Sequence, residues 1–203
     1  MIKLIVFDWN GVLIADARAC WEADNIVLKK FNGIPVKFNT WKKDVVIPAI
    51  DFYVKHGANK RKLLSKKEGC SNIFHTFYER RISKIRTRKN VKKILKWLHK
   101  KNIKCVILSN HTTDGINMQI KRLQIYKFIF HVIANSAKDS SIIKRNKMEK
   151  LRKFIAGEKY KPNEVLIIGD SPEEVEIGKK LGLKTIAITG GYYATFRLKK
   201  NKS

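Results

Sequence analysis

The sequence has few cysteines, few acidic residues and no long apolar run. Cys20, Cys70 and Cys105 are far apart and form no CxxC pair, which argues against a disulfide framework and against a structural zinc site of the usual spacing. We therefore expect a reducing, cytoplasmic setting. No apolar stretch is long enough to span a membrane, and the short apolar stretch that leads to Asp8 is expected to be a strand rather than a signal peptide.

The scarcity of acidic residues leaves a large positive charge. Asp and Glu together number 17 against 44 Lys and Arg, which gives a formal net charge of +27. Such a charge favours anionic ligands and makes nucleic acid a partner to consider. The lysines are scattered over every segment, and solvated helix faces explain the densest stretches, 60–67, 80–93 and 199–202. Nucleic acid is therefore a secondary alternative, and no heptad pattern indicates an oligomeric state.

The apolar residues of this 203-residue chain suffice for one globular domain, or for a core with one modest insertion. Short apolar runs rich in β-branched residues predict strands at 2–7, 103–108, 131–134, 165–168 and 184–188. Their continuous apolar character predicts burial on both faces. Segments of helical period alternate with the later strands, so the expected fold is α/β, a Rossmann-like, three-layer, doubly wound parallel sheet.

The stretch from Asp16 to Thr87 breaks this alternation. It contains no obvious buried strand, and helical spacing dominates. One expected helical face consists of Phe74, Phe77, Tyr78, Arg81, Ile82 and Ile85. We therefore predict a helical insertion at 16–87, placed directly after the first strand, and a core made of residues 1–15 and 88–203.

Polar residues follow several of the predicted strands. Asp8 comes directly after the first strand, Ser109 and Asn110 follow the second, and Asp170 follows the fourth. Lys147 opens the helix that precedes the fourth strand. Ligands of open α/β sheets bind beyond the carboxyl ends of the strands. These side chains are therefore expected to meet in one site.

In order and spacing, these residues resemble the four motifs of the haloacid dehalogenase superfamily. The motifs are Asp8-Trp9-Asn10-Gly11-Val12, Leu108-Ser109-Asn110, Lys147, and Gly169-Asp170-Ser171-Pro172-Glu173-Glu174. The resemblance covers the chain apart from the insertion, whose position is similar to that of the family's helical cap. Within the family, the sequence is most similar to the phosphoglycolate-phosphatase-like branch.

The resemblance implies a hydrolase that removes phosphate from a small phosphorylated metabolite. Asp8 would be the nucleophile that forms an aspartyl-phosphate. Mg²⁺ would be held by Asp8, Asp170 and the backbone carbonyl of Asn10, because carboxylates and carbonyls are the ligands that this ion prefers. Lys147 would neutralise charge in the transition state. The expected substrate contacts are Ser109, Asn110 and Lys147.

Two assignments have alternatives. Lys144 lies close to Lys147 in the sequence and is a second candidate for the lysine of the third motif. Glu174 stands where the family usually has an aspartate that serves the metal site. It also completes the pattern of a helix start, with Ser171 as N-cap and Pro172 in the first turn. Both interpretations of Glu174 are kept.

The sequence departs from the family's phosphatases at Asn10. Phosphatases of the family have a second aspartate there, which protonates the leaving group. An amide does not shuttle protons at neutral pH, so general acid/base assistance of roughly 10²–10⁴-fold is absent or relocated. Asp16 is a possible substitute, although an exposed acid at the hinge of the cap is the plainer interpretation.

This departure keeps two alternative functions open. One is a catalytically weak relative that binds a phospholigand or RNA, and the other is an enzyme that cleaves phosphonates with the help of a lysine in the cap. Specificity is expected to reside in the cap, where the candidate contacts are Trp21, Trp41, Lys42, Lys43, His56, Arg80 and Arg81.

Overall fold

The computed structural model describes residues 1–65, 69–136 and 146–199. Its centre is a five-stranded parallel sheet in the order β3-β2-β1-β4-β5. The strands are β1 (Leu4–Asp8), β2 (Lys104–Thr112), β3 (His131–Asn135), β4 (Val165–Gly169) and β5 (Lys184–Ala187). The predicted doubly wound parallel sheet is thereby confirmed, with strands at all five predicted positions.

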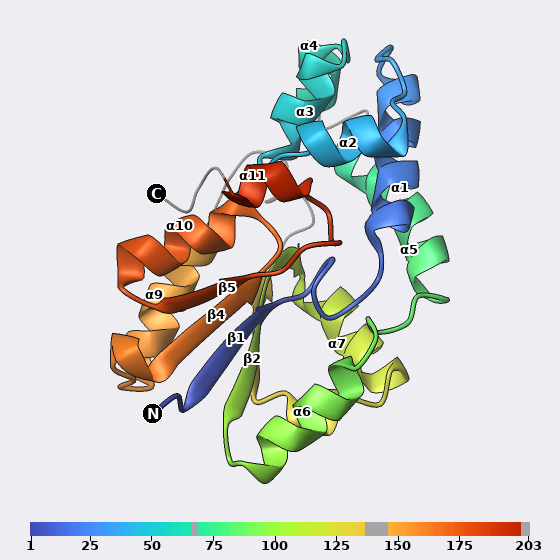
Figure 1. Cartoon of the computed structure of the whole chain (residues 1–203). Coiled ribbons are helices and arrows are strands. Elements are labelled where there is room, and N and C mark those ends of the chain that lie inside the picture. Colours follow the sequence, from blue (N-terminus) through green and yellow to red (C-terminus); the bar gives the residue numbers. More distant parts are fainter. Residues whose placement is uncertain (66–68, 137–145, 200–203) are drawn as a thin grey trace.

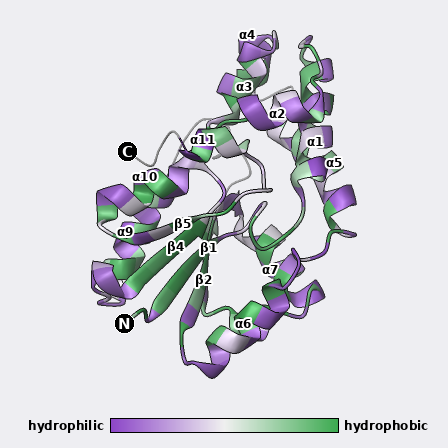
Figure 2. Ribbon diagram, viewed as in Figure 1, coloured by the Kyte–Doolittle hydropathy of each residue, from purple (hydrophilic) through white to green (hydrophobic). Residues whose placement is uncertain are grey.

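Helices cover both faces of the sheet. Helices α6 (Val91–Lys100) and α7 (Thr113–Arg122) pack on the face that carries Ile5 and Phe7 of β1. Helices α9 (Lys147–Gly157) and α10 (Pro172–Leu181) pack on the opposite face, which carries Leu4 and Val6. Successive β1 residues thus alternate between two apolar cores, as expected of a strand buried on both sides. Figure 2 shows the central strands β1 and β4 largely in the hydrophobic colour, whereas the helices mix both characters.

Short elements complete this part of the chain. A 3₁₀ turn, η1 (Tyr126–Phe128), precedes β3, and a second, η2 (Pro162–Glu164), leads into β4. Helix α11 (Thr195–Lys199) ends the described chain. None of the helices in the described ranges is both long and apolar enough to cross a bilayer.

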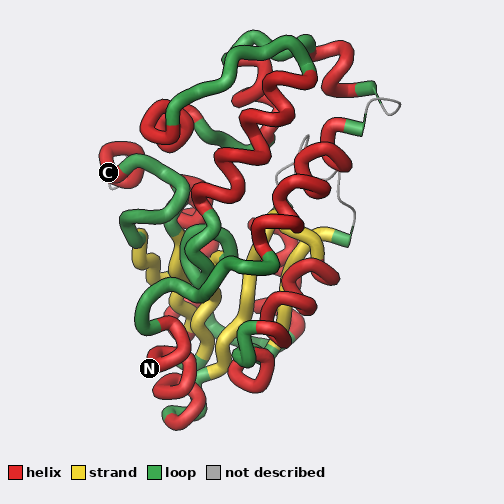
Figure 3. Tube along the Cα trace, turned by 90° about the vertical axis from the view of Figure 1, so that its right-hand side faces the viewer, coloured by secondary structure: helices red, strands yellow, loops and turns green. Residues whose placement is uncertain are grey.

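Five helices are inserted between β1 and α6. They are α1 (Ala17–Lys30), α2 (Phe38–Asp44), α3 (Ala49–Lys55), α4 (Lys60–Leu64) and α5 (Cys70–Ile82). They gather beyond the carboxyl ends of the strands (Figures 1 and 3). The chain enters and leaves this group side by side, because Ala15 N donates to Arg86 O at 3.1 Å and Arg88 N donates to Leu13 O at 3.0 Å. The insertion therefore sits over the edge of the sheet where ligands are expected.

The buried face of α5 differs from the predicted one. Phe77 is 38% exposed and the Arg81 side chain lies in solvent, whereas Ser71 and His75 are buried together with Tyr78. The prediction assumed that apolar residues mark the buried face. Helix α5 also buries Ser71 and His75, because these polar side chains line the cavity. Hydrophobic periodicity does not detect such a face.

Candidate active site

A tight turn carries the chain away from Asp8 at the end of β1. Gly11 has a φ of +73°, and a Cβ at this position would lie 2.5 Å from Oδ2 of Asp170. A Cβ on Gly191 would come within 1.8 Å of the same oxygen. Glycine is needed at both positions because backbone packs directly against the Asp170 carboxylate. The backbone N–H of Tyr192 donates a hydrogen bond to that carboxylate.

Three buried carboxylates meet at this turn. Asp8, Asp170 and Glu174 each place one oxygen so that the three atoms lie within 4.8 Å of one another, and their residues are 6%, 1% and 1% exposed. Burial, reinforced by repulsion from Glu174, raises the pKa of Asp8 to about 7. Burial, with repulsion from Asp8 and Glu174, raises the pKa of Asp170 well above its usual value. This excess of buried negative charge on hard oxygen ligands fits a Mg²⁺ ion.

Lys147 supplies a positive charge beside these acids. It is the first residue of α9, and its Nζ lies 2.9 Å from Oδ1 of Asp8 and 2.7 Å from Oε1 of Glu174. Burial would by itself lower the pKa of Lys147, but the attraction of Asp8, Glu174 and Glu173 raises it well above its usual value. The ammonium is therefore charged. The structure brings Lys147 to Asp8, whereas Lys144 lies outside the described residues.

Glu174 joins the acidic cluster, but it does not complete a capping box, because its carboxylate accepts from the hydroxyl of Ser171 and not from the backbone N–H of Ser171. Ser171 is the N-cap of α10, as predicted, and its Oγ accepts a hydrogen bond from Glu173 N at 3.0 Å. The same hydroxyl donates to Oε2 of Glu174 at 2.5 Å, while Oε1 faces Lys147. The helix start thus fixes the carboxylate that the acidic cluster uses.

Ser109 and Asn110 lie within β2, which continues to Thr112 instead of ending at Leu108 as predicted. The register with β3 shifts between Leu108 and Thr112, so the strand runs on through an irregularity. The Oγ of Ser109 donates to Oδ1 of Asn10 at 3.3 Å, and Nδ2 of Asn110 donates to Oε2 of Glu173 at 3.0 Å. Both side chains therefore face the site.

Asn10 is held by a buried acid. Its Nδ2 donates to Oδ2 of Asp16 at 2.7 Å and to the hydroxyl of Tyr78 at 2.8 Å. Asp16 also accepts hydrogen bonds from Gly11 N and from the hydroxyls of Tyr78 and Tyr192. Burial raises the pKa of Asp16, although these hydrogen bonds oppose the shift. The interpretation of Asp16 as an exposed hinge acid is wrong, because the residue is 0% exposed.

A cavity of about 130 Å³ lies between the sheet edge and the insertion. Of the predicted site residues, those that line it are Asp8, Asn10, Asn110, Lys147 and Asp170. Ser109 and Glu174 are buried and reach the lining residues Asn10 and Lys147 through hydrogen bonds. The insertion contributes a largely apolar wall that includes Val45, Val46, Ile47, Phe52, Tyr53 and Phe74.

None of the seven residues proposed from the sequence as specificity contacts is among these lining residues. Trp41 is instead fully buried, where its Nε1 donates to Oδ2 of Asp24 at 2.7 Å. Asp24 lines the cavity and has a pKa raised by burial to about 6. Asp24 was not predicted from the sequence. The signal that could have found it is an acid on the otherwise apolar buried face of α1.

Comparison with known proteins agrees with this geometry. The family model described as haloacid dehalogenase-like hydrolase matches residues 5–188. No sequence among the curated proteins matches the chain significantly.

Solved structures share the fold at low sequence identity. One described as a predicted phosphatase from Clostridium acetobutylicum has 16% identity and a TM-score of 0.80, with 100% of this chain and 92% of that chain covered. A predicted phosphoglycolate phosphatase from Haemophilus somnus has 20% identity and a TM-score of 0.76, with 99% and 91% covered. CbbY from Rhodobacter sphaeroides, solved in complex with phosphate, has 12% identity and a TM-score of 0.75, with 96% and 89% covered.

The match of the family model to nearly the whole chain agrees with the parallel sheet and the inserted helices. The chain belongs to the haloacid dehalogenase-like hydrolases.

Proposed function

We propose that this enzyme is a Mg²⁺-dependent phosphatase that removes phosphate from a small phosphorylated metabolite through an aspartyl-phosphate on Asp8. The observation that carries the proposal is the placement of Asp8. Its carboxylate lies in a cavity, 2.9 Å from a buried lysine and beside two further buried acids. An aspartate can act as a nucleophile toward phosphorus when a cation masks its repulsion of the phosphate.

The metal ligands in this proposal are Asp8, Asp170 and Glu174, with the backbone carbonyl of Asn10 as a further ligand. When bound, Mg²⁺ supplies the positive charge that draws the phosphate and the nucleophile together. The buried acids account for the need for it, because Lys147 offsets only part of their charge.

The side chains of the cavity would then carry out the reaction. An oxygen of Asp8 attacks phosphorus, a P–O bond forms, and the bond to the leaving oxygen breaks. Lys147 stabilises the charge of the transferring group, with Asn110 as a donor that lines the cavity. Water then hydrolyses the acyl phosphate, which releases inorganic phosphate and restores Asp8.

The orientation of Asn10 limits which leaving groups the enzyme can expel. Its Nδ2 is tied to Asp16 and Tyr78, so its carbonyl oxygen is the atom that faces Ser109. An acceptor oxygen does not donate a proton to a departing alcohol. We therefore expect substrates whose leaving oxygen departs readily without protonation, such as aryl or acyl phosphates.

Residues 16–87 are proposed to be the cap of this enzyme, with residues 1–15 and 88–203 as its catalytic core. The cap closes the cavity with apolar side chains and so excludes bulk water. The cavity volume suits a small substrate. A cytoplasmic location is part of the proposal, because Cys20, Cys70 and Cys105 are all buried free thiols.

The test is phosphate release from an aryl phosphate with and without Mg²⁺. The native protein should require Mg²⁺, and Asp8→Asn should lose activity because an amide is neither a nucleophile nor an anionic ligand. Asp170→Asn should weaken the binding of Mg²⁺ severely and so lower the activity, because it removes a carboxylate ligand. Full activity after treatment with a chelator, or in Asp8→Asn, would show that the mechanism is wrong.

A catalytically weak phospholigand-binding relative is the second candidate, and the geometry of Asn10 is what favours it. Binding of inorganic phosphate with Mg²⁺, measured by calorimetry without any turnover of aryl phosphates, would support that candidate. RNA binding rests on net charge alone. A phosphonate-cleaving enzyme needs a cap lysine, but the described lining of the cavity contains one lysine, Lys147, and it belongs to α9.

A further inference from the structure

We propose that His75, Glu79 and His111 form a second metal site, specific for a divalent transition ion such as Zn²⁺, that joins the insertion to the core. His75 and Glu79 belong to α5, whereas His111 belongs to β2. The three side chains offer ligand atoms that lie within 4.8 Å of one another. This cluster shares no residue with the three carboxylates of Asp8, Asp170 and Glu174.

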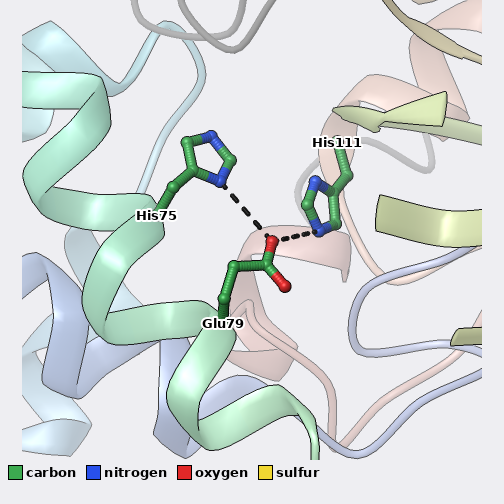
Figure 4. A group of neighbouring side chains, drawn as sticks. All are labelled: His75, Glu79 and His111. Atoms are coloured by element: carbon green, nitrogen blue, oxygen red, sulfur yellow. Dashed lines mark ion pairs between the residues drawn. The ribbon is translucent and has the colours of Figure 1, made fainter. Parts of the chain in front are cut away.

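The backbone places the three ligands together. His75 and Glu79 are four residues apart on α5, so they project from the same face of the helix. Oε1 of Glu79 lies 3.8 Å from Nδ1 of His75 and 3.7 Å from Nε2 of His111. In Figure 4 both ring nitrogens point at this carboxylate from opposite sides. A tetrahedral ion with bonds of about 2.0–2.1 Å separates its ligand atoms by about 3.4 Å. Small side-chain rotations would close the difference.

The surroundings favour a bound ion. The His75 side chain is 9% exposed, and its Nδ1 has no hydrogen-bond partner within the described ranges. A buried ring nitrogen in that state costs free energy that a metal bond would recover. The rings of His75 and His111 lie 5.6 Å apart and nearly parallel, with Phe74 and Tyr78 packed around them. An aromatic shell of this kind keeps water from competing for the ligands.

The ligand types select the metal. Two imidazoles and one carboxylate suit Zn²⁺ and its neighbours in the first transition row, whereas Mg²⁺ prefers oxygen ligands alone. Three protein ligands also leave a fourth position for water. We therefore expect Mg²⁺ to bind at the carboxylates of Asp8, Asp170 and Glu174 without displacing an ion from the His75 site.

The tautomer of His111 affects the affinity of the proposed site for a metal ion. Its Nδ1 accepts a hydrogen bond from Thr112 N at 2.7 Å, so the neutral ring carries its proton on Nε2. Metal binding at Nε2 requires the proton on Nδ1 instead, where Oγ1 of Thr112, 3.4 Å away, is an acceptor. The shift also removes the acceptor of Thr112 N, and the loss of that hydrogen bond lowers the affinity relative to a fully preorganised site.

An ion at this site would connect helix α5 of the insertion to strand β2 of the sheet. His75 lines the catalytic cavity, and His111 directly follows Asn110, which also lines it. Bound zinc would therefore tie α5 to β2 beside the cavity and hold the insertion against the core.

The experiment uses Co²⁺ as a coloured substitute for Zn²⁺ in the full-length chain. The background is Asp170→Asn in excess Mg²⁺, so that binding at the acidic cluster is suppressed. One Co²⁺ should bind with the absorption of a nitrogen-ligated ion, and Zn²⁺ should displace it. Adding His75→Ala or His111→Ala should weaken Co²⁺ binding by more than about tenfold, which is the least that loss of a supporting residue costs.

Two results would overturn the proposal. The first is that the Asp170→Asn protein binds no Co²⁺ under these conditions, and the second is that the histidine variants bind it as tightly as their parent. Circular dichroism checks the fold of each variant. Glu79→Gln serves as the deciding variant if a histidine variant fails to fold, because the Glu79 side chain is one-third exposed and tolerates change best. Glu79→Gln should also weaken Co²⁺ binding, and unchanged Co²⁺ binding would contradict the proposed metal site.

Discussion

Asn10 is the residue at which this enzyme differs most from the phosphatase pattern. Its amide is fixed in orientation by Asp16, which is itself held by Tyr78 and Tyr192. The hydrogen bonds leave the carbonyl oxygen of Asn10 on the side of Ser109. Asn10 therefore matches the usual aspartate in size, but its amide cannot protonate the leaving group.

Replacing Asn10 by Asp should restore that proton. The new carboxyl would lie about where Nδ2 now sits, 2.7 Å from Oδ2 of Asp16. Two buried carboxyls at this distance share one proton, so one of them is kept protonated near neutral pH. The rate on alkyl phosphates should rise by on the order of tenfold or more, and by less on aryl phosphates, because poor leaving groups benefit most from protonation.

The measurement is the dependence of the rate on leaving-group pKa for both proteins. A steep dependence in the native protein that flattens in Asn10→Asp is the expected result. An equally flat dependence in both proteins would show that another group already transfers the proton.

Helix α5 is the inserted helix that contributes Ser71, Phe74 and His75 to the cavity lining. One face of it borders the cavity through Ser71, Phe74 and His75, while Phe77 and Arg81 point to solvent. The two faces give a matched pair of variants within one helix. Phe74 lines the cavity, whereas Arg81 forms a solvent-exposed ion pair with Glu22 at 2.7 Å.

Phe74→Ala should change the relative kcat/KM among a panel of phosphate esters, because it enlarges the cavity by removing part of the apolar wall that contacts the organic part of the substrate. The expected change is roughly tenfold between large and small esters. Arg81→Ala is the control. It should leave both preference and stability nearly unchanged, since exposed ion pairs contribute about 0–1 kcal/mol. Equal changes from both variants would count against the cavity as the site of specificity.

The elements differ in how well the sequence predicted them. The central strands were predictable because burial on both faces requires continuous apolar runs. The prediction of burial on both faces was wrong for the edge strand β5, where Ile186 is 46% exposed. The meeting of Asp8, Asn110 and Asp170 at one cavity was predictable because the carboxyl ends of parallel strands converge. The face of α5 was not, because His75 and Ser71 are polar residues that point inward. The burial of Asp16 was not predictable either, since its partners Tyr78 and Tyr192 lie 62 and 176 residues away along the chain.

At the scale of the whole molecule, a strongly basic chain encloses an acidic site. The chain has a formal net charge of +27, yet the cavity is lined by Asp8, Asp24, Asp170 and Glu173 with Lys147 as the lysine in its described lining. In the proposed function, the positive exterior would draw anionic substrates toward a site that accepts them with a bound metal cation. The buried acids are therefore expected to destabilise the metal-free protein at pH values where they are ionised.

The metal-free protein should lose stability as pH rises. The pKa of Asp8 is raised from 3.8 to about 7 and that of Asp24 from 3.8 to about 6. Between pH 3.8 and about 7, the folded state therefore keeps protons that the unfolded state has released. The free energy of unfolding then falls as pH rises through this window. Thermal unfolding in chelator at about pH 5 and about pH 7.5 measures the difference.

Asp170→Asn should stabilise the metal-free protein at the higher pH. The substitution removes a buried charge that Asp8 and Glu174 repel, and the gain should be on the order of 1 kcal/mol. Mg²⁺ should stabilise the native protein but not the variant. A variant that is less stable than the native protein in chelator would contradict the charge argument.

The central claim is that a phosphoryl group passes through Asp8. The most direct measurement is to mix the protein with Mg²⁺ and a reactive phosphate ester, quench in acid, and locate any added phosphoryl group by peptide mass spectrometry. The account predicts one acid-stable, base-labile phosphoryl group on the peptide that contains Asp8, dependent on Mg²⁺ and absent in Asp8→Asn. Phosphate release that proceeds with no phosphoryl group on Asp8, or with the group on another residue, would contradict it.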